Sequence, residues 1–227
     1  MSTYDFHIHS ALSPCADNEM TPCNIVGMAK VMGHEIIAIS DHNSVKNAAA
    51  VMKAGVREGI RVIPAMEVET MEEVHILTLF KTLEAAEYAA KIVYDKLPDI
   101  KNRPEIFGEQ CIMDEFDNLL GYEEKLLLSP AAISINELFE IVREANGIFI
   151  PAHIDRHSYS VLTNLGFIPD DIDIKYVEVS GNVDSLDDYI NDRPFLKRYK
   201  ITRSSDAHRL DSLVFAADDF GNIEELL

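Results

Sequence analysis

The side chains best suited to metal binding lie near both ends of the chain. His7 and His9 stand one residue apart after a short apolar stretch, and Asp206 and His208 form a similar pair near the opposite end. Because alternate residues of a strand face the same side, both imidazoles of a His-x-His pair point together. Imidazole and carboxylate groups are ligands of zinc, iron and manganese. We therefore expect the two ends of the fold to close one metal site.

Further candidate ligands flank short apolar stretches in the middle of the chain. They are His42, Glu67, His75 and His153. The ends of strands, where loops begin, are places where a scaffold can aim several side chains at one point. A lone histidine is more often structural than a ligand, so it is the combination of residues that favours a metal centre. We interpret His34, in a helix-to-strand turn, and His157, in a polar loop, as structural.

Carboxylates and a thiol accompany these candidates. Asp5 and Asp41 stand beside candidate ligands, where a carboxylate usually accepts the ring N–H of a ligating histidine. We expect Asp41 to support catalysis by orienting a ligand or capping its loop. Asp17 and Cys15 follow the His-x-His pair on one loop, and a carboxylate suits a hard metal ion better than a thiol does, which favours Asp17 as a further ligand. The alternative, that Asp17 only belongs to a turn, stays open.

Two arginines follow candidate ligands closely enough to meet a bound substrate. Arg156 stands three residues after His153, and Arg209 directly follows His208. The planar guanidinium grips phosphate oxygens in a fixed fork. Arg156 and Arg209 are therefore predicted to bind a substrate phosphate, with Arg103 as a weaker third candidate. The alternative for each is an ordinary surface ion pair in a strongly acidic protein.

Seven short apolar stretches with β-branched residues predict the strands of an α/β fold. They cover residues 4–7, 35–40, 61–64, 74–80, 147–151, 176–179 and 199–202. Helical segments with recognisable ends separate most of them. One helix is predicted to begin at Thr21-Pro22 and to end at Gly33, and another to begin at Thr82 and to end before Pro98. A capping box at Ser134-Ile135-Asn136-Glu137 marks the start of a third. The alternation implies a largely parallel sheet, and ligands on nearly every strand imply a closed barrel.

Two parts of the chain depart from this alternation. His75 comes only eight positions after Glu67, which is too close for a crossover helix, so the sequence predicts a local antiparallel hairpin that returns His75 to the Glu67 end. Residues 97–130 break the alternation altogether and are predicted to form an inserted loop with a hairpin. The insertion is expected either to shape the mouth of the pocket or to form a dimer contact. The oligomeric state stays open.

Length and charge narrow the class of protein. With 227 residues, the chain suits a single domain over residues 1–227. The formal net charge of -19 predicts no binding to a long nucleic acid duplex or to an anionic membrane. Small phosphorylated substrates remain compatible, because bound divalent cations reverse the local field. Three cysteines without a Cys-x-x-Cys pair favour a reducing cytoplasm over a disulfide framework.

In its ordered set of candidate ligands, the chain resembles the polymerase and histidinol phosphatase (PHP) superfamily of metal-dependent phosphoesterases. The matching residues are His7-Ile8-His9, Asp41-His42, Glu67, His75, His153 and Asp206-Ala207-His208. The resemblance runs over essentially the whole length and is closest to short bacterial members that act on nucleotides or oligonucleotides. It implies a distorted (β/α)7 barrel, related to the TIM barrel, that holds two or three divalent ions of zinc, manganese or iron.

The resemblance also implies how the ligands divide among the ions. By position they are His7, His9, Glu67 and Asp206 for one ion, Glu67, His75 and His153 for a second, and His42 and His208 for a third. Many relatives place a further histidine or aspartate shortly after the His-x-His pair, where this chain has Pro14 and Cys15. Either Asp17 reaches in from a longer loop, or the third ion is held weakly.

Such a centre breaks a P–O bond with a hydroxide that two cations share and hold in line with phosphorus. No protein nucleophile is needed, so no catalytic side chain is assigned beyond the supporting Asp41. The expected function is a cytoplasmic hydrolase of small phosphoesters: a nucleotide, a short oligonucleotide or another phosphomonoester. The alternatives are a histidinol-phosphatase-like enzyme, a metal-dependent amidohydrolase, and a catalytically silent PHP module that binds metal and regulates.

Overall fold

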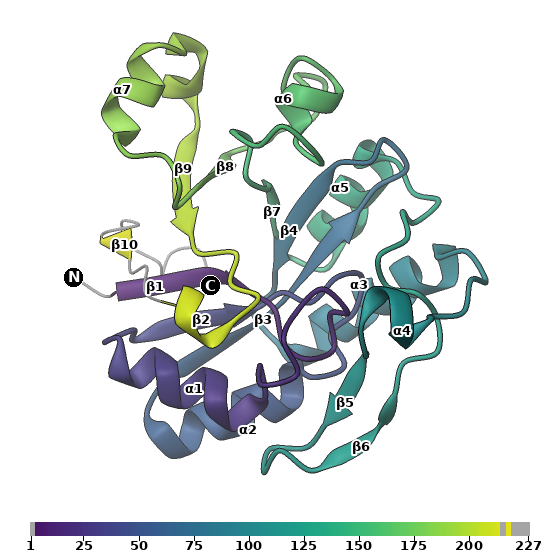
Figure 1. Cartoon of the computed structure of the whole chain (residues 1–227). Coiled ribbons are helices and arrows are strands. Elements are labelled where there is room, and N and C mark those ends of the chain that lie inside the picture. Colours follow the sequence, from purple (N-terminus) through teal and green to yellow (C-terminus); the bar gives the residue numbers. More distant parts are fainter. Residues whose placement is uncertain (1–2, 214–216, 219–227) are drawn as a thin grey trace.

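The computed structural model describes residues 3–213 and 217–218, and all seven predicted strands occur in it. The strands are β1 (Thr3–Ile8), β2 (Ile36–Ile39), β3 (Arg61–Glu69), β4 (His75–Leu79), β7 (Ile148–Pro151), β8 (Tyr176–Ser180) and β9 (Lys200–Ser204). They form a curled wall with helices on its outside (Figure 1). The fold is therefore a mixed α/β structure of the predicted kind, a distorted barrel.

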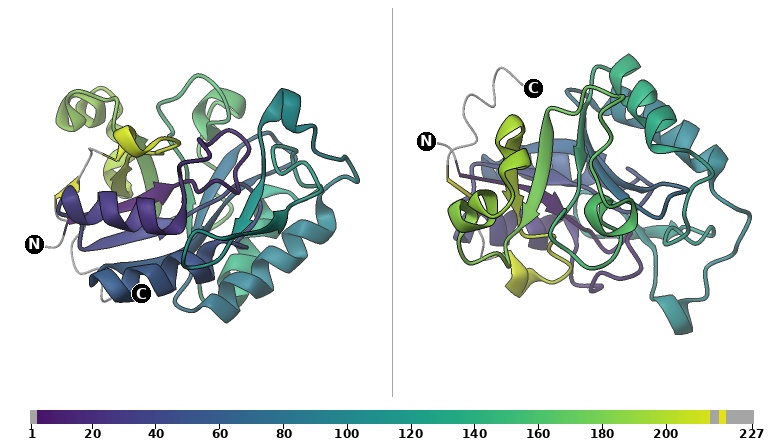
Figure 2. Two further views of the ribbon diagram at one scale, coloured as in Figure 1. Left: turned by 60° about the horizontal axis from the view of Figure 1, so that its bottom comes forward. Right: turned by 90° about the horizontal axis from the view of Figure 1, so that it is seen from above.

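The main sheet contains both parallel and antiparallel pairs. β1, β2 and β3 run parallel, whereas β4 runs antiparallel to both β3 and β7. Glu69 pairs with His75 in the β3–β4 ladder, which confirms the predicted hairpin and makes the sheet more mixed than alternation alone implied. β8 and β9 form a separate parallel pair, and β10 (Ala217–Asp218) pairs antiparallel with β1. Figure 2 shows from above how the sheet curls around its axis.

Side chains help to join the β8–β9 pair to the two edges of the main sheet. At the β1 edge, the Ser204 hydroxyl accepts a hydrogen bond from the Phe6 backbone N–H at 3.3 Å. An Asp5 carboxylate oxygen accepts another from the Ser205 backbone N–H at 3.1 Å. At the β7 edge, the Ile154 backbone N–H donates to the Glu178 carbonyl at 2.9 Å. The barrel is distorted because these two seams replace continuous strand ladders.

A break in the regular pairing of β1 turns two successive side chains toward the barrel interior. The register between β1 and β2 shifts between Asp5 and Ile8. Phe6 belongs to a buried apolar cluster with residues of β3 and β4, while the next side chain, His7, reaches Glu67. A strict two-residue alternation would place these neighbours on opposite faces. The irregularity therefore marks the boundary between the apolar cluster that contains Phe6 and the polar cluster that contains His7.

Three helices, α1, α3 and α5, begin where the sequence predicts, and α1 and α3 also end close to the predicted positions. The longer ones are α1 (Pro22–Val31), α2 (Ala48–Glu58), α3 (Leu83–Lys96) and α5 (Ile135–Glu144), and the shorter ones are α4 (Pro104–Phe107), α6 (Val161–Asn164), α7 (Leu186–Asn191) and the 3-10 helices Pro194–Arg198 and Leu210–Ser212. Thr21, Thr82 and Ser134 each accept a backbone hydrogen bond as N-caps, and Ser134 forms the predicted capping box with Glu137.

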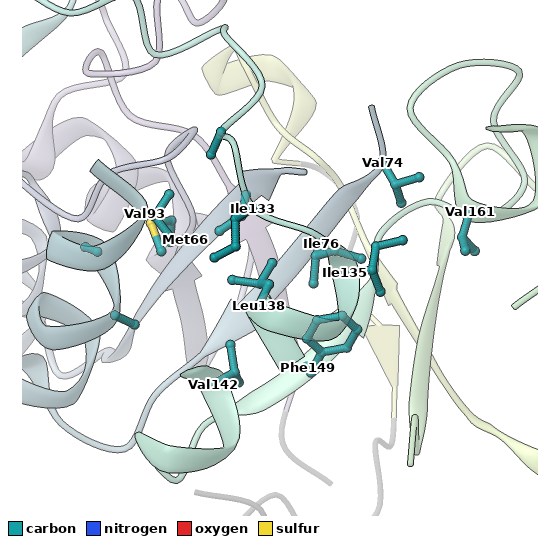
Figure 3. Packing of buried hydrophobic residues seen from close by; sticks show 14 of the residues in the cluster. Met66, Val74, Ile76, Val93, Ile133, Ile135, Leu138, Val142, Phe149 and Val161 are labelled. Carbon is teal, nitrogen blue, oxygen red and sulfur yellow. The ribbon is translucent and has the colours of Figure 1, made fainter. Parts of the chain in front are cut away.

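A large apolar cluster between the sheet and helices α3 and α5 holds the outer layer in place. Figure 3 shows Met66 and Ile76 of the β3–β4 hairpin beside Val93, Leu138 and Phe149. Close packing of this kind stabilises a core because each buried side chain leaves water and gains dispersion contacts. The hairpin that carries Glu67 and His75 is thus backed by the main core.

The insertion contains the predicted hairpin, formed by β5 (Cys111–Met113) and β6 (Leu119–Tyr122). It packs on the loop that follows β1, where the Cys111 backbone N–H donates to the Ala11 carbonyl at 2.8 Å. Gly108, with φ +101°, lies so close to the Pro14 carbonyl that a Cβ atom would not fit. The insertion therefore supports the loop beside the His-x-His pair.

Among the described residues, no helix combines the length and the apolar character needed to cross a bilayer.

Candidate metal centre

Four buried side chains from the two ends of the chain and from β3 converge at the carboxyl ends of the strands. The Nε2 atom of His7 lies 3.2 Å from Glu67 and 3.4 Å from Asp206. The Nε2 atom of His9 lies 3.3 Å from Glu67 and 3.2 Å from Asp206. One ligand atom from each of these four residues lies within 4.8 Å of every other. The arrangement has the donor types and the spacing of a divalent metal site.

Three further imidazoles surround the same Glu67 carboxylate. The Nδ1 atoms of His42 and His75 lie 3.2 Å and 3.0 Å from its two oxygens, and His153 Nε2 lies 3.0 Å away. His42, Glu67 and His75 form a second potential ligand group. Glu67 is therefore central to the whole cluster and belongs to two of its ligand groups.

A third group contains His9, His42 and His208. The His208 ring stacks on the His9 ring with centroids 4.2 Å apart. Its Nδ1 atom lies 2.9 Å from the Asp206 backbone carbonyl, which leaves its Nε2 atom for another partner. The structure thus brings together eight of the nine histidine and carboxylate ligands predicted from the sequence, and leaves out Asp17.

The buried atoms that face one another in this cluster lack hydrogen-bond partners. They are His7 Nε2, His9 Nε2, His42 Nδ1 and Asp206 Oδ1. Leaving a buried polar atom unpaired is costly, and native structures rarely tolerate several together. Divalent metal ions would satisfy these atoms at once, so the residues fit the metal centre that the PHP resemblance implies.

Glu178 orients His7 and was not predicted from the sequence. Both oxygens of its fully buried carboxylate lie 3.0 and 3.1 Å from His7 Nδ1, and one of them accepts the His153 backbone N–H at 3.2 Å. The ring N–H of His7 is therefore directed at Glu178, and its Nε2 atom faces Glu67. The available signal was a single acidic residue within the apolar strand Tyr176-Val177-Glu178-Val179.

Asp41 organises the loop after β1. Its buried carboxylate accepts hydrogen bonds from the Ser10 N–H at 2.7 Å, the Ser10 hydroxyl at 2.6 Å and the Ser13 hydroxyl at 2.7 Å. The Ser13 hydroxyl in turn lies 3.0 Å from His9 Nδ1. Asp41 thus reaches His9 through Ser13, a link that the sequence did not reveal. The role of Asp41 in supporting catalysis stays a prediction.

The other predicted residues divide between the site and the surface. Arg156 Nη1 lies 2.6 Å from Asp206 Oδ2, so Arg156 belongs to the cluster. Arg209 is exposed and pairs with Asp211. Asp17 is also exposed, and its carboxylate accepts the Glu19 backbone N–H at 3.1 Å. No potential ligand group among the described residues includes Asp17, which takes part in a turn instead.

Burial and charge act in opposite directions on the pKa values. Burial alone lowers the pKa of His7 and His9, but neighbouring carboxylates outweigh it, so the pKa of His7 lies well above its usual 6.5 and that of His9 rises to about 9. Burial raises the pKa of Glu67, yet the surrounding histidines hold it well below its usual range. Burial lowers the pKa of His208 to about 4. Protons and metal ions therefore compete for the same imidazoles.

Positive backbone φ angles place several of these side chains. His153, Asp206 and Asn43 have φ angles of 31°, 51° and 50°, a region that non-glycine residues rarely adopt. The Asn43 side chain donates to the Leu127 and Ser129 carbonyls at 2.8 and 3.1 Å. Such conformations persist only where the surrounding structure holds them, and they concentrate at functional sites.

The sequence matches the PHP domain family over residues 5–160. The chain belongs to this family. No curated protein sequence shows significant similarity to this chain.

Solved structures share its fold. The lesion-specific endonuclease EndoQ from Pyrococcus furiosus superposes with a TM-score of 0.70 at 20% identity, over 93% of this chain and 49% of EndoQ. A complex of Endonuclease Q superposes with a TM-score of 0.67 at 18% identity, over 92% of this chain and 49% of that chain. A protein assigned as a metal-dependent phosphoesterase from Bifidobacterium adolescentis gives 0.62 at 17% identity, over 90% and 87% of the two chains. The chain thus spans about half the length of Endonuclease Q.

One expectation from the sequence is wrong. The acidic net charge predicts no binding to a long nucleic acid duplex, but Endonuclease Q, whose structure superposes on this chain over about half its length, holds a 27-mer duplex with an abasic lesion at its active site. Net charge averages over the entire surface, whereas bound cations dominate the field at a metal centre. Net charge alone therefore does not predict whether a protein of this fold binds duplex DNA.

The family match and the phosphoesterase and endonuclease neighbours support a hydrolase, and the histidine and carboxylate groups suit divalent metals.

Proposed function

We propose that this PHP protein is a metal-dependent phosphoesterase that hydrolyses small phosphoesters, with a nucleotide, a short oligonucleotide or another phosphomonoester as substrate. The observation that carries the proposal is Glu67, a single buried carboxylate within 3.3 Å of nitrogen atoms from five histidines. Two or three ions of zinc, manganese or iron would suit this donor set. When bound, such ions lower the pKa of a coordinated water and polarise the phosphate oxygens.

The chain's own residues orient the ligand atoms. Glu178 accepts the ring N–H of His7, and Asp41 acts on His9 through Ser13. These contacts fix which nitrogen of each ring faces the centre, so the site is organised before a substrate arrives. No side chain is assigned as a nucleophile, in keeping with metal-assisted hydrolysis.

Arg156 is proposed to grip the substrate phosphate. Its side chain is 37% exposed, so it reaches solvent while Asp206 Oδ2 holds one guanidinium nitrogen at 2.6 Å. A guanidinium positioned in this way keeps other N–H groups free for phosphate oxygens. Arg209, also predicted for this role, forms an exposed ion pair with Asp211, which matches the alternative of an ordinary surface pair.

A second candidate function is cleavage of damaged DNA. It rests on the superposition of 93% of this chain on about half of EndoQ, a lesion-specific endonuclease. A nucleotide phosphate and a DNA backbone phosphate present the same reacting group, so one metal centre could serve either.

A substrate panel tests the proposal. Purified protein loaded in turn with Zn²⁺, Mn²⁺ or Fe²⁺ is assayed on p-nitrophenyl phosphate, its bis ester, histidinol phosphate, an abasic 27-mer duplex and an amide substrate. We expect phosphoester hydrolysis that the Glu67→Gln variant loses. If the loaded protein leaves the whole panel intact and Glu67→Gln alters only stability, the silent metal-binding module is the correct alternative.

A further inference from the structure

A short loop contacts two of the ligand groups of the candidate metal centre. Residues 155–159 connect the strand end that carries His153 with helix α6. At one end of this loop, Arg156 contacts Asp206 of the first ligand group. At the other end, Tyr159 stacks on His75 of the second group with ring centroids 4.7 Å apart and planes 17° apart. The loop therefore places one cation and one aromatic ring above the two halves of the site.

Tyr159 is unusually exposed for an aromatic ring in such a position. Its relative exposure is 45%, although one face lies against an imidazole of the buried cluster. Its backbone φ of 55° lies in the left-handed region, which a bulky residue rarely adopts. Its carbonyl accepts the His75 backbone N–H at 2.9 Å. The backbone is thus held in an unfavourable conformation that leaves this ring partly exposed to solvent beside His75.

Both ends of the loop are anchored. The Asp155 carboxylate accepts hydrogen bonds from the Ser180 N–H at 2.7 Å and from its hydroxyl at 2.6 Å. The buried Ser160 hydroxyl donates to the Ile154 carbonyl at 3.0 Å and caps α6. Because its neighbours are fixed in this way, the Tyr159 ring loses little conformational entropy when a flat ligand stacks on it.

We propose that Tyr159 is a specificity-determining residue that stacks on the nucleobase of a nucleotide whose phosphate Arg156 grips. The inference rests on the proposed phosphoesterase function and narrows its substrate to phosphoesters that carry an aromatic base. Stacking on a tyrosine accepts every base, because each has a π-face, and so it selects nucleotides without selecting sequence. Sugar phosphates that lack a base have no ring to stack on Tyr159, so this residue does not increase their affinity.

The test compares adenosine 5′-monophosphate with ribose 5-phosphate, which share the phosphoester and differ by the base. Steady-state kinetics are measured for the wild type, Tyr159→Leu and Tyr159→Phe, and metal content is measured for each. Tyr88→Leu is the matched control, since Tyr88 on α3 is 49% exposed and lies outside the site. If neither compound is hydrolysed, calorimetric dissociation constants replace KM.

We expect the wild type to prefer the nucleotide, and Tyr159→Leu to raise its KM for the nucleotide about tenfold with kcat and metal content unchanged. Tyr159→Phe and Tyr88→Leu should behave as the wild type, and no variant should change KM for ribose 5-phosphate. Equal KM values for both compounds in the wild type would overturn the inference without any variant. The inference would also fail if Tyr159→Leu lowered kcat for both compounds or reduced the metal content. Such a result would mean that Tyr159 holds His75 in place and does not bind the base.

A different result would reject the proposed phosphoesterase function. Loss of hydrolysis on every phosphoester would reject the phosphoesterase, whereas a base-dependent dissociation constant that needs Tyr159 would still uphold the stacking role.

Discussion

At the scale of single residues, the candidate centre depends on how buried imidazoles share a few carboxylates. His7 lies between Glu67 and Glu178, and the two carboxylates contact opposite nitrogens of its ring. The Glu178 contact therefore decides the tautomer that faces the cluster. We therefore predict that Glu178, which is not itself a candidate ligand, affects metal affinity as strongly as a ligand does.

The Glu178→Gln variant tests this role. The amide is a weaker acceptor for the His7 ring N–H, so we expect metal affinity to fall about 10–100-fold while the fold is kept. Metal titration by calorimetry measures the change, and Glu87→Gln, at an exposed position on α3, is the control. An affinity equal to that of the wild type would show that Glu178 does not position His7.

Metal affinity is expected to depend on pH through the same imidazoles. In the metal-free fold, the pKa of His9 is raised from its usual 6.5 to about 9. Between pH 6.5 and 9 the His9 ring is therefore protonated and must lose a proton before it can bind an ion. Affinity should therefore rise as pH increases from 6.5 to 9, by about tenfold per pH unit for each proton displaced. Competition titrations with a chelator at several pH values measure the slope, and a flat profile would contradict the assigned protonation.

Stability of the metal-free protein should change in the opposite direction. A histidine whose pKa is raised by folding contributes stability that is fully present below its unfolded pKa of 6.5 and is lost as pH rises through its folded pKa of about 9. We expect the Tm of chelator-treated protein to fall between pH 6.5 and 9. Thermal unfolding with and without metal checks this, since bound metal should remove the dependence.

At the scale of elements, loops reach the site because backbone groups from distant segments hold them. Asn43 follows His42, and its side chain joins three segments. Its Nδ2 group donates to the Leu127 and Ser129 backbone carbonyls, and its Oδ1 atom accepts the Glu69 backbone N–H at 3.1 Å. Its positive φ further restricts which residues fit. The insertion is thereby connected to the loop of a candidate ligand.

The Asn43→Ala variant should lose about 3 kcal/mol of unfolding free energy, because buried backbone groups lose partners and alanine is strained at positive φ. Urea unfolding followed by circular dichroism measures the change. Asn43→Gly relieves the backbone strain and keeps the loss of hydrogen bonds, so it should be less destabilising. Equal stability of wild type and Asn43→Ala would show that the insertion does not brace this loop.

At the scale of the whole molecule, the metal centre joins both ends of the chain. β1 supplies His7, and His9 follows its last residue. The loop after β9 supplies Asp206 and His208, across a seam made partly by side chains. Ions bound there should act as a cross-link between chain ends. The single-domain organisation over residues 1–227 stays a prediction, which one cooperative calorimetric transition would support.

Removal of metal should therefore destabilise the entire fold. A ligand present at about 1,000 times its dissociation constant adds about 4 kcal/mol to the unfolding free energy. We expect a chelator to lower Tm by several degrees, and readdition of the native ion to restore it. Glu67→Gln should show no such response. An unchanged Tm in the wild type would mean that the cluster holds no ion tightly.

The sequence determined much of the fold and of the site, because these features follow from local rules. Apolar stretches placed all seven strands, and Thr21, Thr82 and Ser134 marked helix starts through capping chemistry that acts within one turn. The spacing of Glu67 and His75 required their hairpin. The candidate ligands, named from residue type and position, come together in space, although their ligand roles stay predictions.

Only the tertiary structure decided which groups meet. Glu178 reaches His7 across 171 positions of the sequence, and Arg156 reaches Asp206 from another loop. Asp17 lies close to His9 in the sequence, but its carboxylate accepts a hydrogen bond from the Glu19 backbone N–H. Spacing along a chain fixes the local direction of a side chain, whereas closure of the barrel brings side chains from distant strands within a few ångströms of one another. The partners of a buried charge are therefore set by that closure.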